Sequence, residues 1–574
     1  MEMTFNELIR SVTEEYLSQL DVDNPPTHIT VERELLESVN REIAIYNKGP
    51  EDPPGSDEFP SPKKGDAKYR MLKVLSPSQI GRILVYLHRA RRIYHGKNDG
   101  TDNVSIGTYV TEGKNEGIYD VSDVHLEALV RQYNDAATTR DVSEVVAWLR
   151  SLAPSVSVCD DMNLVAVNNG IYDYETKMLM DFDPELVFLT KSHVNFVDNA
   201  VNPIIHNDDD STDWDVESWM QSLSDDAEIV DLLWKLCGAI IRPNVSWNKS
   251  AWLYSESGNN GKGTLCRLMR NLCGDGAHAS IPISAFSNQF GLEALTHVSA
   301  VIVDENDTNT YLDKVAALKS VITGDPVTVD RKFKQAITVT FRGMMVQCVN
   351  ALPQFKDKSD SAYRRLLLIP MDKRFEGKER KYIKNDYLNR PEVLEYVLYK
   401  ILAETSYYEL PVPPLCEELL STYKTFNDPI REFLEDVMGH VVWGLLPWQF
   451  MYDMYVGWYA RNNGSGKAEK KGNFMIRVRS LIGEYVEWEE CGLTRVGAKM
   501  DEPEPLIAEY NLVPWMNSSY TGRDLDKRCS PDHLADRYRG LIRRVQGTEM
   551  AGDEISDLPS NLQDTSSDDS IVNE

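Results

Sequence analysis

One glycine-rich segment constrains the fold of this chain more than any other: Tyr254-Ser-Glu-Ser-Gly258-Asn259-Asn260-Gly261-Lys262-Gly263-Thr264. An apolar run precedes it, and apolar residues at helical spacing follow it. Strand, glycine-rich loop and helix in this order are typical of a phosphate-binding loop, because the backbone N–H groups converge on an anion and the helix N-terminus adds positive potential. We expect Lys262 to reach the β- and γ-phosphates of a nucleoside triphosphate. The candidate nucleotide-binding residues are Gly258, Asn260, Gly261, Lys262, Gly263 and Thr264.

The segment departs from the usual G-x-x-x-x-G-K-[ST] pattern at two positions. Glu256 stands at the first glycine, and Gly263 follows the lysine where a hydroxyl side chain normally meets Mg²⁺. The hydroxyl must then come from Thr264, or water must replace it. An acid beside a triphosphate is unfavourable unless it points outward, so we expect Glu256 at the outer edge of the loop. The alternative is a glycine-rich turn that binds nothing, and three further elements argue against it.

The first of these elements is an apolar strand pattern that ends in two carboxylates. The run 297–303 is followed by Asp304 and Glu305. At a phosphate, one carboxylate can hold Mg²⁺ through water while the other orients the attacking water. We assign the metal to Asp304, together with Thr264, and the water to Glu305, because the first carboxylate after such a strand usually faces the metal. A strand that ends in an acidic turn is the alternative.

The other two elements are strand patterns with polar residues at their ends. The run 343–349 ends at Asn350, whose amide can sense the γ-phosphate and the water; a strand-capping asparagine is the alternative. Arg364 and Arg365 open the apolar run 366–370. An exposed arginine at this place is what a neighbouring subunit would use as a finger on the transferring phosphate, whereas a surface salt bridge is the alternative for each.

A β-hairpin pattern with a basic tip precedes the asparagine strand. Val327 and Val329 alternate with polar residues, as do Ile337 and Val339. A basic hairpin with an aromatic residue at its tip suits a nucleic-acid backbone with bases nearby, although a merely solvated hairpin would show the same pattern. The candidate DNA-binding residues of the tip are Arg331, Lys332, Phe333 and Lys334.

As a set, these residues resemble superfamily 3 helicases, the AAA+ motors of small DNA viruses, phages and plasmids. The hairpin 325–334 is similar to the pore hairpin of the papillomavirus initiator helicase. The segments 260–264 and 350–353, with the arginine pair, resemble the phage and plasmid primase family that includes the poxvirus primase-helicase. The segment 169–173 is similar to the domain that precedes the motor in that family. The resemblance covers roughly residues 105–500.

The resemblance implies an α/β fold, with an AAA+ P-loop motor whose parallel sheet lies between helices. It implies ATP and Mg²⁺ as cofactors, a homo-oligomer in the form of a hexameric ring, and 3′→5′ movement on single strands. It places Arg365 at a subunit boundary, with Arg364 as the second choice. By the same resemblance, Lys319 is expected to reach the phosphate of the adjacent subunit.

Composition shifts and patterns divide the chain into nine segments. We expect an N-terminal helical segment over 1–46, an acidic proline-rich linker over 47–66, a helical or mixed domain over 67–150, a helical or collar domain over 151–240, the ATPase over 241–375, a helical connection over 376–425, a winged-helix-like domain over 426–505, a basic C-terminal segment over 506–546 and a disordered acidic tail over 547–574. Within 151–240, the pattern predicts short strands with turns over 159–189, followed by two helices.

Basic residues outside the motor form two stretches. In the winged-helix-like domain, Lys470 and Lys471 are candidate contacts to duplex or origin DNA. In the N-terminal region, 67–97 is expected to be helical and ends in a basic stripe at 88–95. This stripe could touch DNA, but we favour a solvated helix face. No cluster of carboxylates or zinc ribbon indicates a primase site.

The charge balance limits how the chain can bind DNA. The 574 residues carry 61 Lys and Arg against 90 Asp and Glu, a net charge of −29, which argues against nonspecific coating of DNA. A ring that is acidic outside and basic in its channel is consistent with both the net negative charge and the basic hairpin tip. None of the eight cysteines has C-x₂-C spacing, and no secretory signal or membrane-length apolar run is present. We expect a cytoplasmic protein with no membrane partner, in the bacterial host cytoplasm if a phage encodes it.

These patterns together indicate an ATP-dependent replicative DNA helicase of a phage, plasmid or integrated element, acting on single-stranded, forked and origin DNA, with replication proteins as further partners. The alternative is an initiator that uses nucleotide only to assemble on an origin, without processive unwinding. Glu305, Asn350 and Arg365 favour hydrolysis. A signalling ATPase would lack the basic hairpin.

Overall fold

A computed structural model describes residues 4–48, 69–94, 104–288, 290–307, 311–312, 314–332, 336–357, 359–377, 380–462 and 467–544. The chain forms two compact units, Met1–Asn427 and Asp428–Glu574. The expected tail 547–574, and the expected linker beyond its first two residues, lie outside the described residues.

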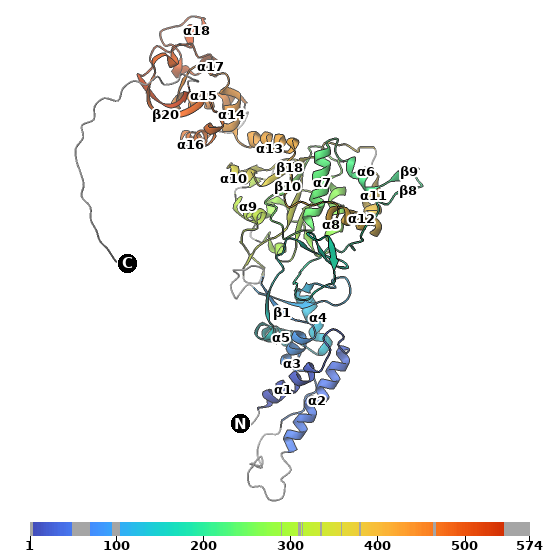
Figure 1. The fold of residues 1–574 in the computed structure, drawn as a ribbon. Helices are drawn as coiled ribbons and strands as arrows, with labels where there is room; N and C mark the ends of the chain where they lie inside the picture. Colours follow the sequence, from blue (N-terminus) through green and yellow to red (C-terminus); the bar gives the residue numbers. More distant parts are fainter. Residues whose placement is uncertain are drawn as a thin grey trace, which may run out of the picture. The chain divides into compact units, whose positions relative to one another are not determined.

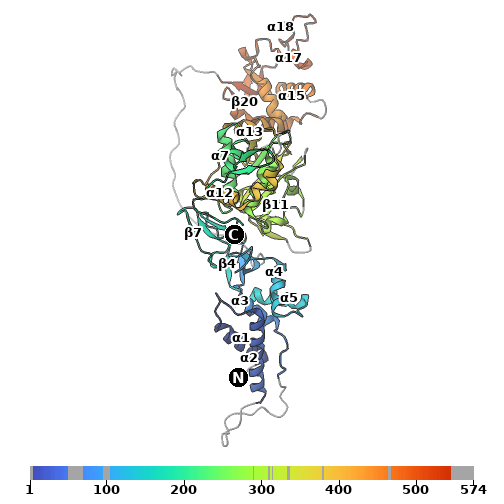
Figure 2. The same ribbon diagram turned by 90° about the vertical axis from the view of Figure 1, so that its right-hand side faces the viewer.

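The first unit begins with helices that share one apolar core. Leu35, Val39, Ile83 and Val145 are fully buried in it, at helical spacing on their elements. Helices α1 and α2 lie side by side in both views (Figures 1 and 2). The helices are α1 (Phe5–Ser18), α2 (His28–Lys48), α3 (Pro77–Tyr86), α4 (Asp123–Tyr133) and α5 (Thr139–Leu152). A four-stranded sheet accompanies them in the order β3 (Tyr119–Asp120), β2 (Val104–Tyr109), β1 (Arg91–Tyr94) and β4 (Ser155–Ser157).

The expectation of a basic helix reaching residue 97 is wrong. Helix α3 ends at Tyr86, Arg89 has a positive φ of 47°, and the chain then enters strand β1. Ile93 is fully buried between two partly exposed neighbours, a period-two pattern that suits a strand. Arg92 Nε donates to Ala153 O at 2.9 Å, and Arg89 pairs with Asp23 at 2.6 Å. The stripe therefore holds the domain together instead of forming a solvated helix face.

The region 151–240 contains the short strands and the two helices that the sequence pattern predicts, together with one further hairpin. A three-stranded antiparallel sheet comes first, because Asn168-Asn169 makes a tight turn between two short apolar strands. The elements are β5 (Leu164–Val167), β6 (Gly170–Asp173), β7 (Met178–Met180), the hairpin β8 (Ile205–Asn207) and β9 (Thr212–Trp214), and the helices α6 (Val216–Gln221) and α7 (Ala227–Ile240). Asp226 caps α7 by accepting from Glu228 N at 2.8 Å.

A five-stranded sheet forms the centre of the first unit. Its order is β11 (His278–Ala279), β12 (Ala300–Val303), β16 (Met344–Val349), β10 (Ser250–Tyr254) and β18 (Leu366–Pro370), and every pairing between neighbours is parallel. If the five strands are numbered 1 to 5 in chain order, starting from β10, their order across the sheet is 2-3-4-1-5. Side chains alternate between two buried cores, so both faces of the sheet are covered, as in other parallel sheets.

Helices cover the two faces of this sheet (Figure 1). One face packs against α7 and α8 (Lys262–Cys273), and the other against α9 (Ala316–Thr323). The remaining elements of the first unit are β13 (Tyr311–Leu312), β14 (Val327–Val329), β15 (Ile337–Val339), β17 (Gln354–Phe355), α10 (Asp360–Tyr363), α11 (Lys381–Asn385), the 3₁₀ turn η3 (Tyr387–Asn389), α12 (Pro391–Leu402) and α13 (Pro414–Asn427).

The second unit has its own aromatic-rich core around a three-stranded antiparallel sheet. Its elements are α14 (Pro429–Val437), β19 (Leu445–Pro447), α15 (Trp448–Asn462), α16 (Lys471–Leu481), β20 (Trp488–Arg495), α17 (Leu506–Glu509), α18 (Leu525–Arg528) and β21 (Arg537–Arg543). The expected division at residue 505 differs from the structure, because β21 is the central strand between β19 and β20 and buries Leu541 completely. Residues 506–544 therefore belong to the same folded unit.

Candidate nucleotide-binding site

The glycine-rich segment forms a loop between β10 and α8. Gly261 caps the helix with a left-handed φ of 88°, and a Cβ at this position would approach Leu223 Cδ2 to 2.7 Å, so only glycine fits. Asn260 is buried and its Nδ2 donates to Ser257 O at 2.5 Å, which fixes the turn. Glu256 is exposed and accepts from Tyr254 Oη at 3.0 Å. This acid thus lies at the outer edge of the loop.

Lys262 is only 6% exposed, and its ammonium group is held by neutral acceptors. Its Nζ donates to Asn350 Oδ1 at 2.8 Å and to Ser255 O at 3.2 Å. Burial lowers the pKa of Lys262. Within the described part of the chain no carboxylate pairs with this amine, so its charge is left for an anionic ligand.

Asp304 lies at the end of β12 with its two oxygens in different environments. Oδ2 accepts from Arg270 Nη1 at 2.8 Å, while Oδ1 is buried and has no hydrogen-bond partner. An orphaned carboxylate oxygen beside a phosphate loop fits a water bound to Mg²⁺. Glu305, the next residue, is exposed. Asp304 could therefore hold the metal, and Glu305 is exposed to solvent. Thr264, its expected partner, is partly buried, and among the described residues no hydrogen bond joins its hydroxyl to Asp304.

Two buried thiols pack beneath Asp304. Cys266 Sγ and Cys348 Sγ are 3.3 Å apart, and both lie within 4.8 Å of the carboxylate. The hydrogen bond between the thiols, together with burial, raises the pKa of Cys266. Because a neutral thiol is a poor partner for a hard cation such as Mg²⁺, we regard the pair as packing.

Asn350 lies where β16 ends, and β16 lies between β10, which precedes the loop with Lys262, and β12, which directly precedes Asp304. The structure therefore brings together Lys262 and Asn350 by a direct bond, and places Asp304 on the adjacent strand. Sequence reasoning missed Asn306, whose Nδ2 donates to Gln347 Oε1 at 2.9 Å and to Cys348 O at 3.0 Å. It also missed Arg270, although Arg270 follows Lys262 by eight residues and so shares its helix face.

The arginine pair lies in a separate group of contacts. Arg365 Nη1 donates to Ser361 O, and its Nε is buried without a partner. Lys319 Nζ pairs with Asp357 Oδ2 at 2.6 Å and contacts Ser361 Oγ at 3.3 Å. Arg364 is exposed. Thus Lys319 and Arg365 meet at Ser361, and among the described residues neither bonds to the loop 254–264.

The hairpin forms as expected, with β14 and β15 antiparallel and Val327 opposite Val339. Arg331 is partly buried and Lys332 is exposed, whereas Phe333 and Lys334 lie outside the described residues. Arg331 lines a cavity of about 920 Å³, which also has Arg150 and Lys191 in its wall.

Basic residues of α16 in the second unit are partly neutralised. Arg477 pairs with the buried Asp428 at 2.6 Å, and Arg479 pairs with Glu490 at 2.8 Å. Lys470 is exposed at the start of the helix, and Lys471 Nζ donates to Gln449 Oε1. Of the two expected DNA contacts, Lys470 is therefore the more accessible to DNA.

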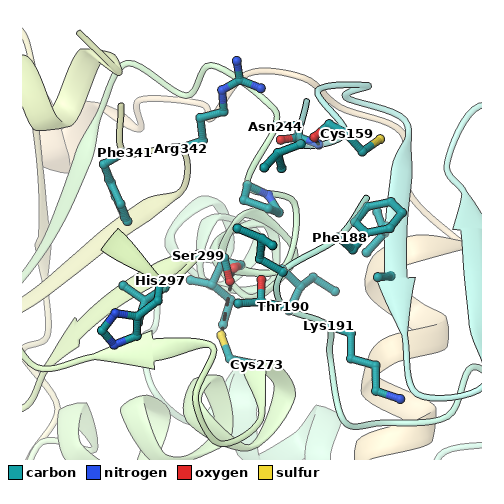
Figure 3. Close-up of a pocket in the computed structure, with 18 of the residues that line it drawn as sticks. Cys159, Phe188, Thr190, Lys191, Asn244, Cys273, His297, Ser299, Phe341 and Arg342 are labelled. Carbon is teal, nitrogen blue, oxygen red and sulfur yellow. Dashed lines mark hydrogen bonds between the residues drawn. The ribbon is translucent and has the colours of Figure 1, made fainter. Parts of the chain in front are cut away.

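A second, smaller cavity of about 120 Å³ lies beside the end of β15 (Figure 3). Phe188 and Phe341 line it, with Thr190 and Ser299, while Lys191 and Arg342 extend away from its centre. None of its lining residues belongs to the loop 254–264. This cavity is distinct from the candidate nucleotide site.

Two family models match parts of the chain. Residues 81–225 match "D5 N terminal like", and residues 253–365 match "Family of unknown function (DUF5906)". The second match spans every candidate ATPase residue from Gly258 to Arg365. No curated protein matches. Among the described residues, no helix is both long and apolar enough to cross a membrane.

The chain also matches solved structures, at low sequence identity. "The apo structure of NrS-1 C terminal region" is 14% identical, with 74% of this chain and 97% of that chain covered and a TM-score of 0.43. An A form apo structure of the same region is 15% identical, with 74% and 98% covered and a TM-score of 0.40. A JCV helicase structure with a bound acetamide compound is 16% identical, with 36% and 58% covered and a TM-score of 0.24.

Proposed function

We propose that this protein is an ATP-dependent DNA helicase that hydrolyses ATP at the loop 254–264. The observation that carries the proposal is the bond from Lys262 to Asn350, beside Asp304 with its unpartnered oxygen. The strand order places β16, which directly precedes Asn350, between the loop strand β10 and the carboxylate strand β12. The match of residues 81–225 to a D5 N-terminal-like family further supports a replication protein.

Each residue of the site has a role in hydrolysis. The loop N–H groups and Lys262 bind the phosphates. Asp304 and Thr264 would hold Mg²⁺, which would supply positive charge to the phosphates. Glu305 accepts a proton from the attacking water and orients it. Asn350 now bonds to Lys262 and would share its amide between this amine and the γ-phosphate.

The hairpin connects hydrolysis to DNA. Lys319 precedes it on α9 and bonds toward Ser361, which also contacts Arg365. When Arg365 contacts the nucleotide of a neighbouring subunit, these contacts can therefore shift α9, the helix that precedes the hairpin. In a ring, each subunit would present one basic tip to the channel.

Hydrolysis should be stimulated by DNA. A motor couples its ATPase to the translocating strand, so single-stranded DNA is expected to raise the rate of ATP hydrolysis by about tenfold, the effect of roughly 1.4 kcal/mol on the barrier. Steady-state phosphate release with and without an oligonucleotide measures this. An unchanged rate on every DNA, with nucleotide-dependent origin binding retained, would favour the initiator without unwinding.

Arg365 should act on the neighbouring site. Arg365→Ala and Lys262→Ala subunits are each expected to be inactive, whereas mixtures contain interfaces with an intact loop and an intact finger. Phosphate release at varied mixing ratios is expected to rise above both pure variants. If Arg365→Ala hydrolyses at the wild-type rate, the finger assignment fails and Arg364 becomes the candidate.

A further inference from the structure

A lysine from another segment, Lys384, lies beside a position at which the glycine-rich loop has no side chain. Gly263 occupies the position after Lys262 at which phosphate loops carry a hydroxyl. A Cβ built on Gly263 would lie 3.3 Å from Lys384 Nζ. Gly263 is the second residue of α8, so this ammonium group lies beside the first turn of the helix, next to the glycine-rich loop.

Hydrogen bonds on both sides of Lys384 hold its segment against the loop and α8. Phe375 N donates to Asn259 O in the loop at 2.8 Å. On the other side, Arg267 Nη2 of α8 donates to Asn389 Oδ1 at 2.8 Å, and Asn389 Nδ2 donates to Lys384 O at 3.2 Å. The position of Lys384 is therefore set by the nucleotide loop and its helix.

The charge of Lys384 has no counter-charge in the described part of the chain. Lys384 is half-buried, and its Nζ has no hydrogen bond or ion pair there. A cation at a helix N-terminus is unfavourable, and the buried Lys262 adds a second cation to the same loop. An anion bound between these groups removes both penalties. The arrangement therefore favours an anionic ligand such as a phosphate.

We propose that Lys384 binds the phosphates of the nucleotide held by the same subunit. The ammonium group compensates phosphate charge at the place where a hydroxyl would otherwise help to hold Mg²⁺. A side chain at 263 would contact the ammonium group closely, so Lys384 would have to shift slightly to admit one. The inference rests on the proposed function, because it needs a nucleotide at the loop.

Calorimetric titration of the full chain with ATP, with Mg²⁺ and with EDTA, tests the inference. Lys384→Ala is expected to raise the Kd about tenfold, as the loss of one hydrogen bond between charged groups does, and to lose more affinity in EDTA than in Mg²⁺. Lys384→Arg should stay within about threefold of wild type because it keeps the charge. The control is Lys381→Ala, an exposed lysine of the same helix α11, which should bind as wild type.

Gly263→Thr provides a second test that does not depend on removing the lysine. In the wild-type background the added side chain should weaken ATP binding, because it meets Lys384 Nζ. Combined with Lys384→Ala, the same change should restore part of the affinity in Mg²⁺ but not in EDTA, since the hydroxyl can then help to hold the metal. Such non-additivity is expected only of groups that share one space.

The outcomes separate this inference from the proposed function. If the wild-type chain binds no nucleotide, the proposed function fails and the inference with it. If wild type binds ATP and Lys384→Ala binds equally well, only the inference is overturned. Equal loss of affinity in the alanine and arginine variants, together with a lowered Tm, would also overturn it by assigning Lys384 a structural role.

Discussion

Replacing Lys262 by alanine is expected to abolish nucleotide turnover, with a fall in ATP hydrolysis of about 100-fold or more, the size seen when a preorganised charge donor is lost from a transition state. Lys262 is the only lysine or arginine within the loop 254–264, and its buried amine is already held toward Asn350. Steady-state phosphate release with saturating Mg²⁺ and ATP measures the effect.

The matched control for this change is Lys235→Ala. Lys235 forms a partly exposed pair with Asp231 one turn away on α7, and such pairs contribute little to stability. This variant should hydrolyse ATP as wild type does. Wild-type hydrolysis by Lys262→Ala would refute the assignment of the loop, because no other residue in it can supply the charge.

Lys332→Ala is expected to abolish strand separation while basal hydrolysis continues. Lys332 is exposed on the hairpin tip, apart from the residues around the loop. In a ring of six the change removes six charges from the channel, and each lost phosphate contact flattens the dependence of log affinity on log salt by about 0.7 for a single strand. Strand displacement and salt-dependent binding to a labelled oligonucleotide measure both effects.

Lys356→Ala serves as the control for charge, because Lys356 is an exposed lysine of the same unit outside the hairpin. It should leave displacement and the salt slope unchanged. If Lys332→Ala displaces a strand from a preloaded fork at the wild-type rate, the hairpin is not the contact to DNA, and the initiator alternative gains support. Phe333 and Lys334 of the same tip remain predicted contacts.

The sequence predicts the centre of the site because parallel strands end at one sheet edge. Lys262, Asp304 and Asn350 each follow an apolar run, so knowing the strand pattern suffices to place them together. The contacts of Lys384 with α8 cannot be predicted this way, since they join segments about 120 residues apart through packing. Only the missing hydroxyl at Gly263 signals that another group is needed there.

The regions that flank the motor also contain packing contacts that the sequence pattern does not predict. The basic residues 88–95 have no charge pattern that separates a strand from a helix, and the packing of Ile93 decides in favour of β1. The sequence pattern predicts β21 as part of a separate segment, because its partner strand β19 lies about 90 residues earlier in the chain. A sequence pattern therefore predicts a single helix or strand more readily than it predicts which other element that helix or strand packs against.

The most direct test of the account is strand displacement from a synthetic DNA fork by the wild-type chain, followed by fluorescence with ATP and Mg²⁺. We predict displacement that requires both ATP and Mg²⁺ and is absent when Lys262 is replaced by alanine. Displacement that continues without ATP, or a complete lack of displacement by a chain that binds the fork and hydrolyses ATP, would contradict the helicase assignment.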